Sequence, residues 1–270
     1  MNKPRLATPY AVWIIGFTVL PLLFVLYYGL TDSSGNFTLA NIAAIADPIH
    51  LKALWLSLLL AFIATTVCLI IAYPLAMIMR KMNLSKGSFI VMLLILPMWM
   101  NHLLKTLAWQ LLLSNNGLIN SFITALGFEP VQMLNTSGAI VLGMIYDFLP
   151  FMLLPIFNAL TRIDKDVIDA ARDLGANSLT VFRRIILPLS MPGIISGITM
   201  VFVPSMTSFV ISDILGGGKI LLIGNVIEQE FTQTGNWNLG SGLSIVLMMF
   251  IIFNMVISAV TDKDGEAQTL

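Results

Sequence analysis

An acidic residue lies deep within an apolar segment of this chain. Asp147 stands about nine residues into the run 138–160, roughly 14 Å from its start at the rise of an α-helix. An ionisable group at that depth usually faces a cavity and has a function, and the adjacent Tyr146 and Phe148 offer aromatic faces that attract cations. We therefore expect these three residues to line a path for a cation. The alternative is a carboxylate that only hydrogen-bonds a neighbouring helix.

Two other residues are candidates for the same path. Asp213 directly follows the apolar run 190–212, where it could equally be a simple charge at a helix end. Trp99 could turn its ring toward the path, or could anchor its helix at the membrane interface as tryptophans often do. Both are expected to lie on the outer side of the chain.

His102 and Lys105 interrupt the apolar run 88–113. We expect Lys105 to extend outward or to pair with a lipid headgroup or an acidic neighbour, and His102 to make a polar contact between helices. An acid–base pair of His102 and Asp147 would indicate a membrane-embedded enzyme, but the two residues are expected at different depths. We therefore expect a protein that is not an enzyme.

Residues that bind metals and nucleotides are scarce. The chain has one cysteine and two histidines, too few for a typical metal cluster. The stretch "LGGGKI" lacks both the spacing and the hydroxyl residue of a phosphate-binding loop. We expect no cofactor in this chain and no nucleic-acid partner.

Composition identifies an all-α integral membrane protein. Hydrophobic residues make up 57% of the chain and charged residues 10%, with a mean hydropathy of +0.91, whereas soluble domains carry about 25% charge. Runs of about 20 apolar residues can span a bilayer as helices. We expect a single domain over 1–270 with an uncleaved first span and six spans in all, at about 10–30, 53–79, 88–113, 138–160, 190–212 and 242–260.

Positive charge gives the orientation, because Lys and Arg accumulate in cytoplasmic loops. With both termini placed inside, eleven of the fourteen basic residues fall on the inner side: Lys3, Arg5, Arg80, Lys81, Lys86, Arg162, Lys165, Arg172, Arg183, Arg184 and Lys263. Both termini and the loop 161–189 are therefore expected to be cytoplasmic.

The loop 161–189 reads as two short helices. Asp164 can cap the first, and Gly175 can end it in the left-handed conformation. The second is expected to begin near Asn177 and stop at Pro188. On the first helix Val167, Ala170, Ala171 and Leu174 form an apolar ridge of small residues. Such a ridge suits docking into a protein groove, although an amphipathic connector packed on its own bundle is the alternative.

The spacing within this loop resembles a family signature. Asp169-Ala170-Ala171, three residues, Gly175, nine residues, then Ile185, one residue and Leu187-Pro188 is similar to the Glu-Ala-Ala-x3-Gly-x9-Ile-x-Leu-Pro pattern of binding-protein-dependent ABC importer permeases. The one departure, Asp169 for Glu, keeps the charge but shortens its reach. The resemblance implies a type I importer fold in which these seven residues form the coupling loop that docks on a separate ATPase subunit.

Other segments resemble the polyamine permeases of that family, notably "VLGMIYDFLPFMLLPIFNAL" and "FVISDILGGGKILLIGNVIEQEF". The resemblance implies import of spermidine or putrescine, a second permease subunit, two ATPase subunits that bind ATP and Mg²⁺, and an extracytoplasmic polyamine-binding protein. The outer segments agree with a cationic cargo, since six acidic residues there face two basic ones: Asp32, Asp47, Glu129, Asp213, Glu228 and Glu230 against Lys52 and Lys219. An importer of another solute, or a transporter driven by an ion gradient, is the alternative.

Overall fold

The structure, a computed structural model, describes residues 10, 13–82, 92 and 96–267, with side chains as far as Val256. Within these ranges the chain forms helices, and the described residues contain no β-strand beyond an isolated bridge between Thr31 and Phe37. The all-α fold class is confirmed.

Four helical stretches of the described chain are long and apolar enough to cross a bilayer. They are α4 (Pro48–Lys81), α8 (Ser137–Arg162), the stretch Ser178–Thr207, and α14 (Trp237–Ala267). The stretch Ser178–Thr207 comprises α10 (Ser178–Val181), η3 (Phe182–Ile186) and α11 (Leu187–Thr207).

A shorter apolar helix covers Ile15–Gly29, made of η1 (Ile15–Val19) and α2 (Leu20–Gly29). It lies where the first span is expected. Part of the expected third span, at 88–91 and 93–95, lies outside the described residues, as do the basic residues Lys3, Arg5 and Lys86 of the orientation argument.

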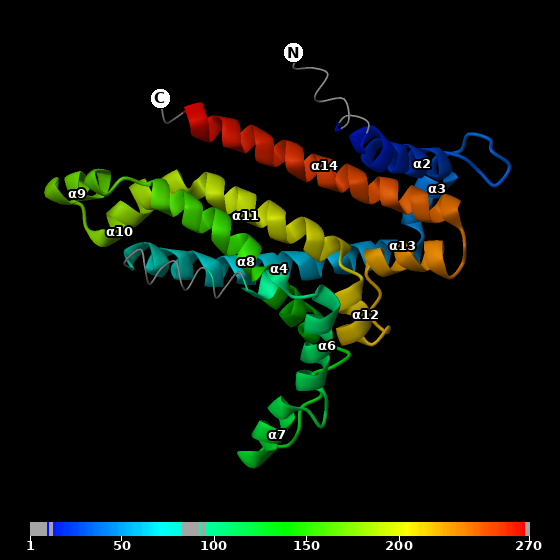
Figure 1. Ribbon diagram of the computed structural model, residues 1–270, viewed down its shortest axis with the longest axis horizontal. Coiled ribbons are helices and arrows are strands. Elements are labelled where there is room, and N and C mark those ends of the chain that lie inside the picture. Colours follow the sequence, from blue (N-terminus) through cyan, green and yellow to red (C-terminus); the bar gives the residue numbers. More distant parts are fainter. Residues whose placement is uncertain (1–9, 11–12, 83–91, 93–95, 268–270) are drawn as a thin grey trace.

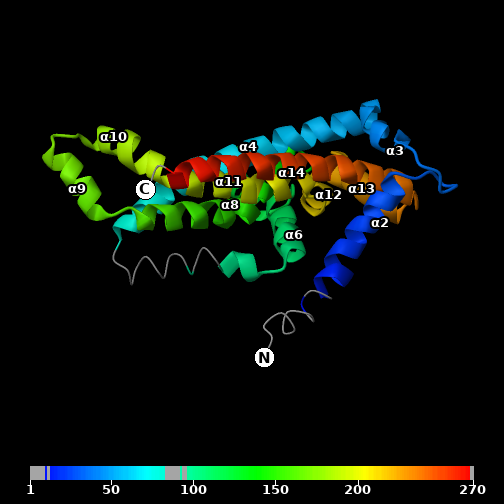
Figure 2. The same ribbon diagram turned by 90° about the horizontal axis from the view of Figure 1, so that it is seen from above.

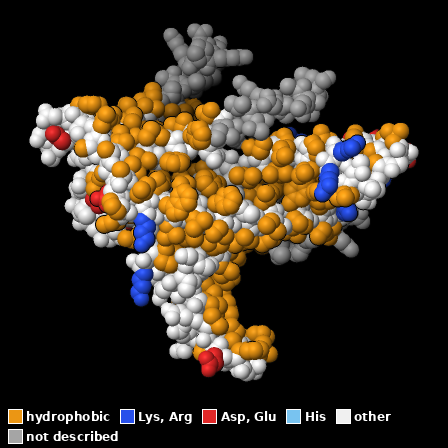
Figure 3. Space-filling model, turned by 180° about the vertical axis from the view of Figure 1, so that it is seen from behind, with side chains coloured by type: hydrophobic (Ala, Val, Ile, Leu, Met, Phe, Trp, Pro, Cys, Tyr) orange, Lys and Arg blue, Asp and Glu red, His pale blue; other side chains and the backbone are white. Residues whose placement is uncertain are grey.

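The long helices form one elongated bundle. α8 packs against both α4 and α11, and α14 packs against α11 and α2. Figures 1 and 2 show α9 (Lys165–Asp173) and α10 at one end of this bundle, and α3 (Ala40–Ala43) and α13 (Ile223–Thr232) at the other. α4, α8 and α14 run toward the end that carries α9, and α11 runs back from it (Figure 1). Figure 3 shows hydrophobic side chains over most of one face of the bundle.

Small residues allow the central helices to approach closely. α4 buries a stripe of small residues at helical spacing: Ala61, Ala64, Cys68, Ala72 and Ala76. On α11, Gly193 and Gly197 face α8, where an added Cβ would lie 2.6 Å from the Pro155 carbonyl oxygen and 2.8 Å from the Met152 sulfur respectively. This four-residue spacing of small residues is typical of helix contacts in membranes, where close backbone approach replaces the hydrophobic driving force.

The third apolar run is broken. A helical turn at 96–99 ends at Met100, and α6 (His102–Leu113) begins with Asn101 as its cap, whose Oδ1 accepts hydrogen bonds from the Leu103 and Leu104 amides at 2.9 and 3.3 Å. Figure 1 shows α6 leaving the bundle across the direction of α4 and α8, followed by α7 (Leu118–Ala125). The interruption expected at "NHLLK" is therefore a change of direction. It aims the first turn of α6 at the middle of α8.

The end of the coupling loop also differs from expectation. The second short helix does not stop at Pro188; it continues into α11, and the helix ends at Thr207 rather than at 212. The π-helical turn Phe182–Ile186 ends two residues before Pro188. Such a turn changes the hydrogen-bond spacing, which lets a residue without an N–H group enter the helix. After a bend at Ser208, residues Val210–Gly216 form the separate helix α12.

Candidate functional site

Local caps define the loop 161–189, which is expected to couple to the ATPase and is called the coupling segment below. Asp164 accepts a hydrogen bond from the Asp166 amide at 3.1 Å and starts α9. Gly175 has φ +84°, and its N–H donates to the Arg172 carbonyl at 2.8 Å, which ends the helix in the left-handed conformation expected from sequence. Asn177 then caps α10 through the Thr180 amide at 2.8 Å. Short-range chemistry thus defines the segment.

The apolar ridge of α9 divides between two faces. Ile168 is buried and Ala171 half-buried, and both pack against the core at this end of the bundle. Val167, Ala170 and Leu174 are exposed, Leu174 with 90% of its surface. The face available to another protein therefore carries Val167, Ala170 and Leu174, with Ala171 at its edge.

The other signature residues divide in the same way. Asp169 is exposed and pairs with Arg172 at 3.3 Å along the helix. Ile185 and Leu187 are half-buried, Leu187 against the same core, while Pro188 is exposed. The signature thus combines residues that anchor the segment with residues that it presents.

Side chains of α4 bind both ends of this segment, where it leaves α8 and where it enters α11. At the end of α8, the Arg80 guanidinium donates to the Ile163 carbonyl at 2.8 Å. At the start of α11, the Tyr73 hydroxyl and the Ser190 hydroxyl are 2.9 Å apart. Sequence reasoning used Arg80 only as a topology marker. The contact joins two helices that are distant in sequence, so no local pattern indicates it.

Asp147 is the centre of a buried ion cluster. Its side chain is 4% exposed, and the Lys105 ammonium, itself on a side chain only 8% exposed, lies 2.6 Å from Asp147 Oδ1. The His102 Nδ1 contacts the other carboxylate oxygen. Both basic residues come from the first turn of α6. The expectation that His102 and Asp147 lie at different depths is wrong, because the break at Met100 lets the first turn of α6 lie against the middle of α8. Lys105 has the acidic neighbour that was one of its expected partners.

Aromatic residues lie next to this cluster. Trp109, one turn after Lys105, meets Tyr146 edge to face with ring centroids 5.4 Å apart. Phe148 packs against two neighbouring apolar clusters of the core, and its ring centroid lies 6.5 Å from that of Phe151. Trp99 stands before the helix break and is 84% exposed. The structure thus brings Tyr146 together with α6, and it places Phe148 in the hydrophobic packing.

Asp213 belongs to a separate network. Its Oδ1 accepts a hydrogen bond from the buried Asn225 of α13 at 2.7 Å, and Asn225 also donates to the Phe209 carbonyl at 3.1 Å. Partial burial of Asp213 and the nearby negative charge of Glu228 raise its pKa above the usual value, while the Asn225 hydrogen bond opposes them. Asp213 fixes the junction of α12 and α13, with its carboxylate at the surface.

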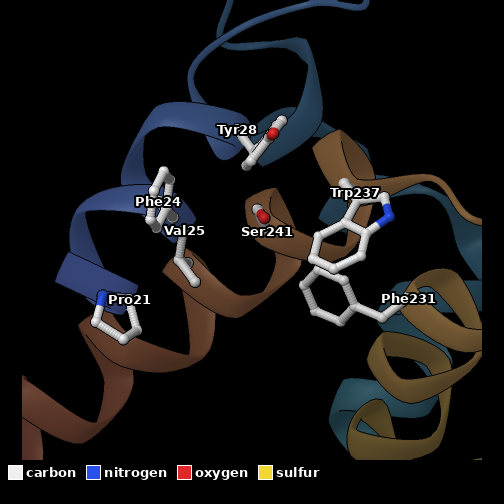
Figure 4. A pocket seen from close by; sticks show the side chains of 7 residues that line it. All are labelled: Pro21, Phe24, Val25, Tyr28, Phe231, Trp237 and Ser241. Carbon is white, nitrogen blue, oxygen red and sulfur yellow. The ribbon is translucent and has the colours of Figure 1, made fainter. Parts of the chain in front are cut away.

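A hollow of about 500 Å³ lies between α2, α13 and α14. It is lined by Pro21, Phe24, Val25, Tyr28, Phe231, Trp237 and Ser241 (Figure 4). The hydroxyl groups in its lining are those of Ser241 and Tyr28, and the lining includes no carboxylate. The hollow therefore offers apolar contact and none of the charge that a cation requires.

Comparisons with known proteins agree on one family and one fold. The model of the family described as binding-protein-dependent transport system inner membrane component matches residues 72–262. The spermidine/putrescine transport system permease protein PotB of Haemophilus influenzae is 40% identical over 252 residues, covering 89% of this chain and 88% of that protein. The Escherichia coli protein of the same name is 39% identical over 243 residues, covering 87% and 88%.

Solved structures match at the level of the fold. The bacterial alginate ABC transporter, in complex with its alginate-bound periplasmic protein, has a chain that superposes with a TM-score of 0.80 at 14% identity, over 94% of this chain and 91% of that one. The methionine transporter MetNI has one with a TM-score of 0.57 at 16% identity, over 82% and 98%.

Proposed function

The chain belongs to the family of binding-protein-dependent transport system inner membrane components, and from this premise we propose that it is a permease subunit of an ATP-driven importer of polyamines such as spermidine and putrescine. It is a transport subunit and not an enzyme. The observation that supports the proposed polyamine substrate is the 40% identity to a spermidine/putrescine permease over nearly nine-tenths of both chains.

Importers of this family act with an ATPase and a substrate-binding protein. The complete assembly here contains a second, similar permease, two ATPase subunits that bind ATP and Mg²⁺, and an extracytoplasmic polyamine-binding protein. The loop 161–189 docks on the ATPase through the exposed face of α9, and closure of the ATPase pair moves the helices between inward-open and outward-open states. Arg80 and Tyr73 support this role because they join the two ends of the segment to α4.

The chain is a multi-pass protein of the inner membrane. Both termini lie in the cytoplasm in our proposal. Two observations support this orientation: α14 runs toward the end of the bundle that carries α9 (Figure 1), and basic residues cluster at that end, namely Arg80, Lys81, Arg162, Lys165, Arg172, Arg183 and Arg184.

The polyamine path includes Asp147 and Tyr146, with Phe148, Asp213 and Trp99 as further members. A polyamine carries several ammonium groups, which carboxylates and aromatic rings both bind. Asp147 supports this assignment best because its carboxylate is buried, contacts the basic side chains of Lys105 and His102, and lies next to the Trp109–Tyr146 pair.

The test is transport by the reconstituted complex of this chain with its partner permease, ATPase and binding protein. We expect ATP hydrolysis and uptake to rise when the binding protein carries spermidine or putrescine. A response only to the binding protein of another solute would refute the polyamine substrate and leave the importer intact. Uptake that continues without ATP would instead favour transport driven by an ion gradient.

A further inference from the structure

The carboxylate of Asp147 already holds an ammonium group of its own chain. Lys105 Nζ lies 2.6 Å from Oδ1, and both side chains are more than nine-tenths buried. No described residue makes a hydrogen bond of ordinary geometry to either carboxylate oxygen. A carboxylate has about four acceptor positions, so ion pairing leaves Asp147 with acceptor capacity to spare.

The position of Lys105 on α6 is electrostatically unfavourable apart from this pair. It stands in the first turn of a 12-residue helix, where backbone N–H groups and the helix dipole already present positive charge. His102 adds a second basic group to the same turn. The carboxylate of Asp147 therefore offsets the unfavourable position of the Lys105 ammonium and joins the first turn of α6 to α8.

One member of the cluster reaches the surface of the chain. The His102 side chain is 40% exposed, whereas those of Lys105 and Asp147 are buried behind it. The aromatic pair Trp109–Tyr146 follows one turn further along α6. The partly exposed His102 imidazole thus contacts the buried carboxylate directly, and the two rings lie beside that carboxylate because Tyr146 is its neighbour in the chain.

We propose that Lys105 occupies on Asp147 the place that an ammonium group of the cargo takes during transport. The inference rests on the proposed polyamine function. The lysine head group and the terminal amine of a polyamine are the same chemical group, a primary ammonium on a methylene chain. Exchange of one for the other keeps the buried carboxylate paired throughout, which avoids the large penalty of a bare buried charge.

This arrangement gives a path site that binds weakly and releases quickly. The flexible four-carbon stem of Lys105 allows its ammonium to withdraw and return. Its return displaces the cargo, so that Lys105 lowers the residence time of a polyamine at Asp147. Lys105 is thus a positioning residue that sets both affinity and turnover.

The experiment measures two quantities on the same complexes: equilibrium binding of labelled spermidine to the two permeases and ATPase in nanodiscs, and maximal uptake after addition of the binding protein. In Lys105→Met we expect spermidine to bind about tenfold more tightly, since its competitor is gone, and maximal uptake to fall. In Asp147→Asn, alone or combined with Lys105→Met, we expect binding at this site to be lost.

Lys105→Arg is the matched variant that keeps the charge and protects the test from a failure of Lys105→Met to assemble. A guanidinium can donate two hydrogen bonds to one carboxylate. We therefore expect assembly to be retained, and spermidine binding to weaken because its competitor at Asp147 is held more tightly. A purely structural lysine predicts less assembled complex but unchanged affinity in the part that assembles. Unchanged or weaker binding in assembled Lys105→Met, or unchanged binding in Lys105→Arg, overturns the inference.

The two proposals fail in different ways. If the wild-type complex neither binds spermidine nor responds to the polyamine-loaded binding protein, the proposed substrate is wrong and this inference falls with it. If wild-type uptake of spermidine is normal and only the Lys105 variants behave as the structural alternative predicts, the substrate stands and the exchange at Asp147 is refuted.

Discussion

The Arg80 guanidinium of α4 donates a 2.8 Å hydrogen bond to the Ile163 carbonyl, the residue at which α8 ends and the coupling segment begins. A free carbonyl at a helix end is thereby bound by a charged donor from a neighbouring helix, an interaction that contributes about 1.5–3 kcal/mol when partly buried. The contact fixes the origin of the segment relative to the bundle.

Replacing Arg80 with Met should loosen that origin. We expect uptake to fall several-fold while ATP hydrolysis persists, because the segment moves without carrying the helices with it. The measurement is the ratio of cargo imported to ATP hydrolysed in proteoliposomes. Arg80→Lys, which keeps a donor, is the control and should retain most of the ratio. A Met variant with the wild-type ratio would show that the contact has no part in coupling.

Replacing each of the two alanines of the signature with a large side chain should have different effects on uptake and stability. Ala170 is exposed and Ala171 is half-buried against the core. Ala170→Trp is therefore expected to abolish ATPase-driven uptake with little change in the thermal stability of the isolated chain. Ala171→Trp should lower both, because it also overpacks the core by about 1–3 kcal/mol. Normal uptake with Ala170→Trp would refute docking through this face.

Gly193 should tolerate no side chain. An added Cβ meets the Pro155 carbonyl oxygen at 2.6 Å and the Ala159 Cβ at 2.5 Å, so Gly193→Ala must separate α11 from α8 and destabilise the chain by about 1–3 kcal/mol. Gly138→Ala is the matched control, since its new Cβ finds a single neighbour at 3.7 Å. Thermal unfolding in detergent distinguishes them. Equal melting temperatures would contradict the close packing.

The raised pKa of Asp213 predicts a dependence of stability on pH. A carboxyl group that is harder to ionise in the folded chain than in the unfolded chain destabilises the fold once both states are ionised, and the effect disappears as pH falls through the raised pKa toward the usual value of 3.8. Asp213→Asn keeps an oxygen for the Asn225 amide and removes the charge. It should be more stable than wild type at neutral pH and lose that advantage in acid. The check is a melting-temperature profile against pH, and a constant difference would contradict it.

Local patterns predicted the coupling segment because its determinants lie close in sequence. The caps at Asp164 and Asn177 and the left-handed Gly175 each depend on residues within about one helical turn. The end of the second helix at Pro188 was mispredicted, since the preceding π-helical turn is a feature of the folded helix that no single residue announces.

The sequence by itself determined an all-helical membrane protein, the family to which it belongs and the caps of the two short helices in the loop 161–189, because composition, helix periodicity and spaced motifs are all read along the chain. Only the tertiary structure decided which side chains meet. Lys105 and Asp147 are 2.6 Å apart because the helix breaks at Met100 and α6 then crosses α8. Ala171 turns toward the core because of how α9 packs. Such contacts depend on the relative placement of helices distant in sequence, which hydrophobic periodicity does not specify.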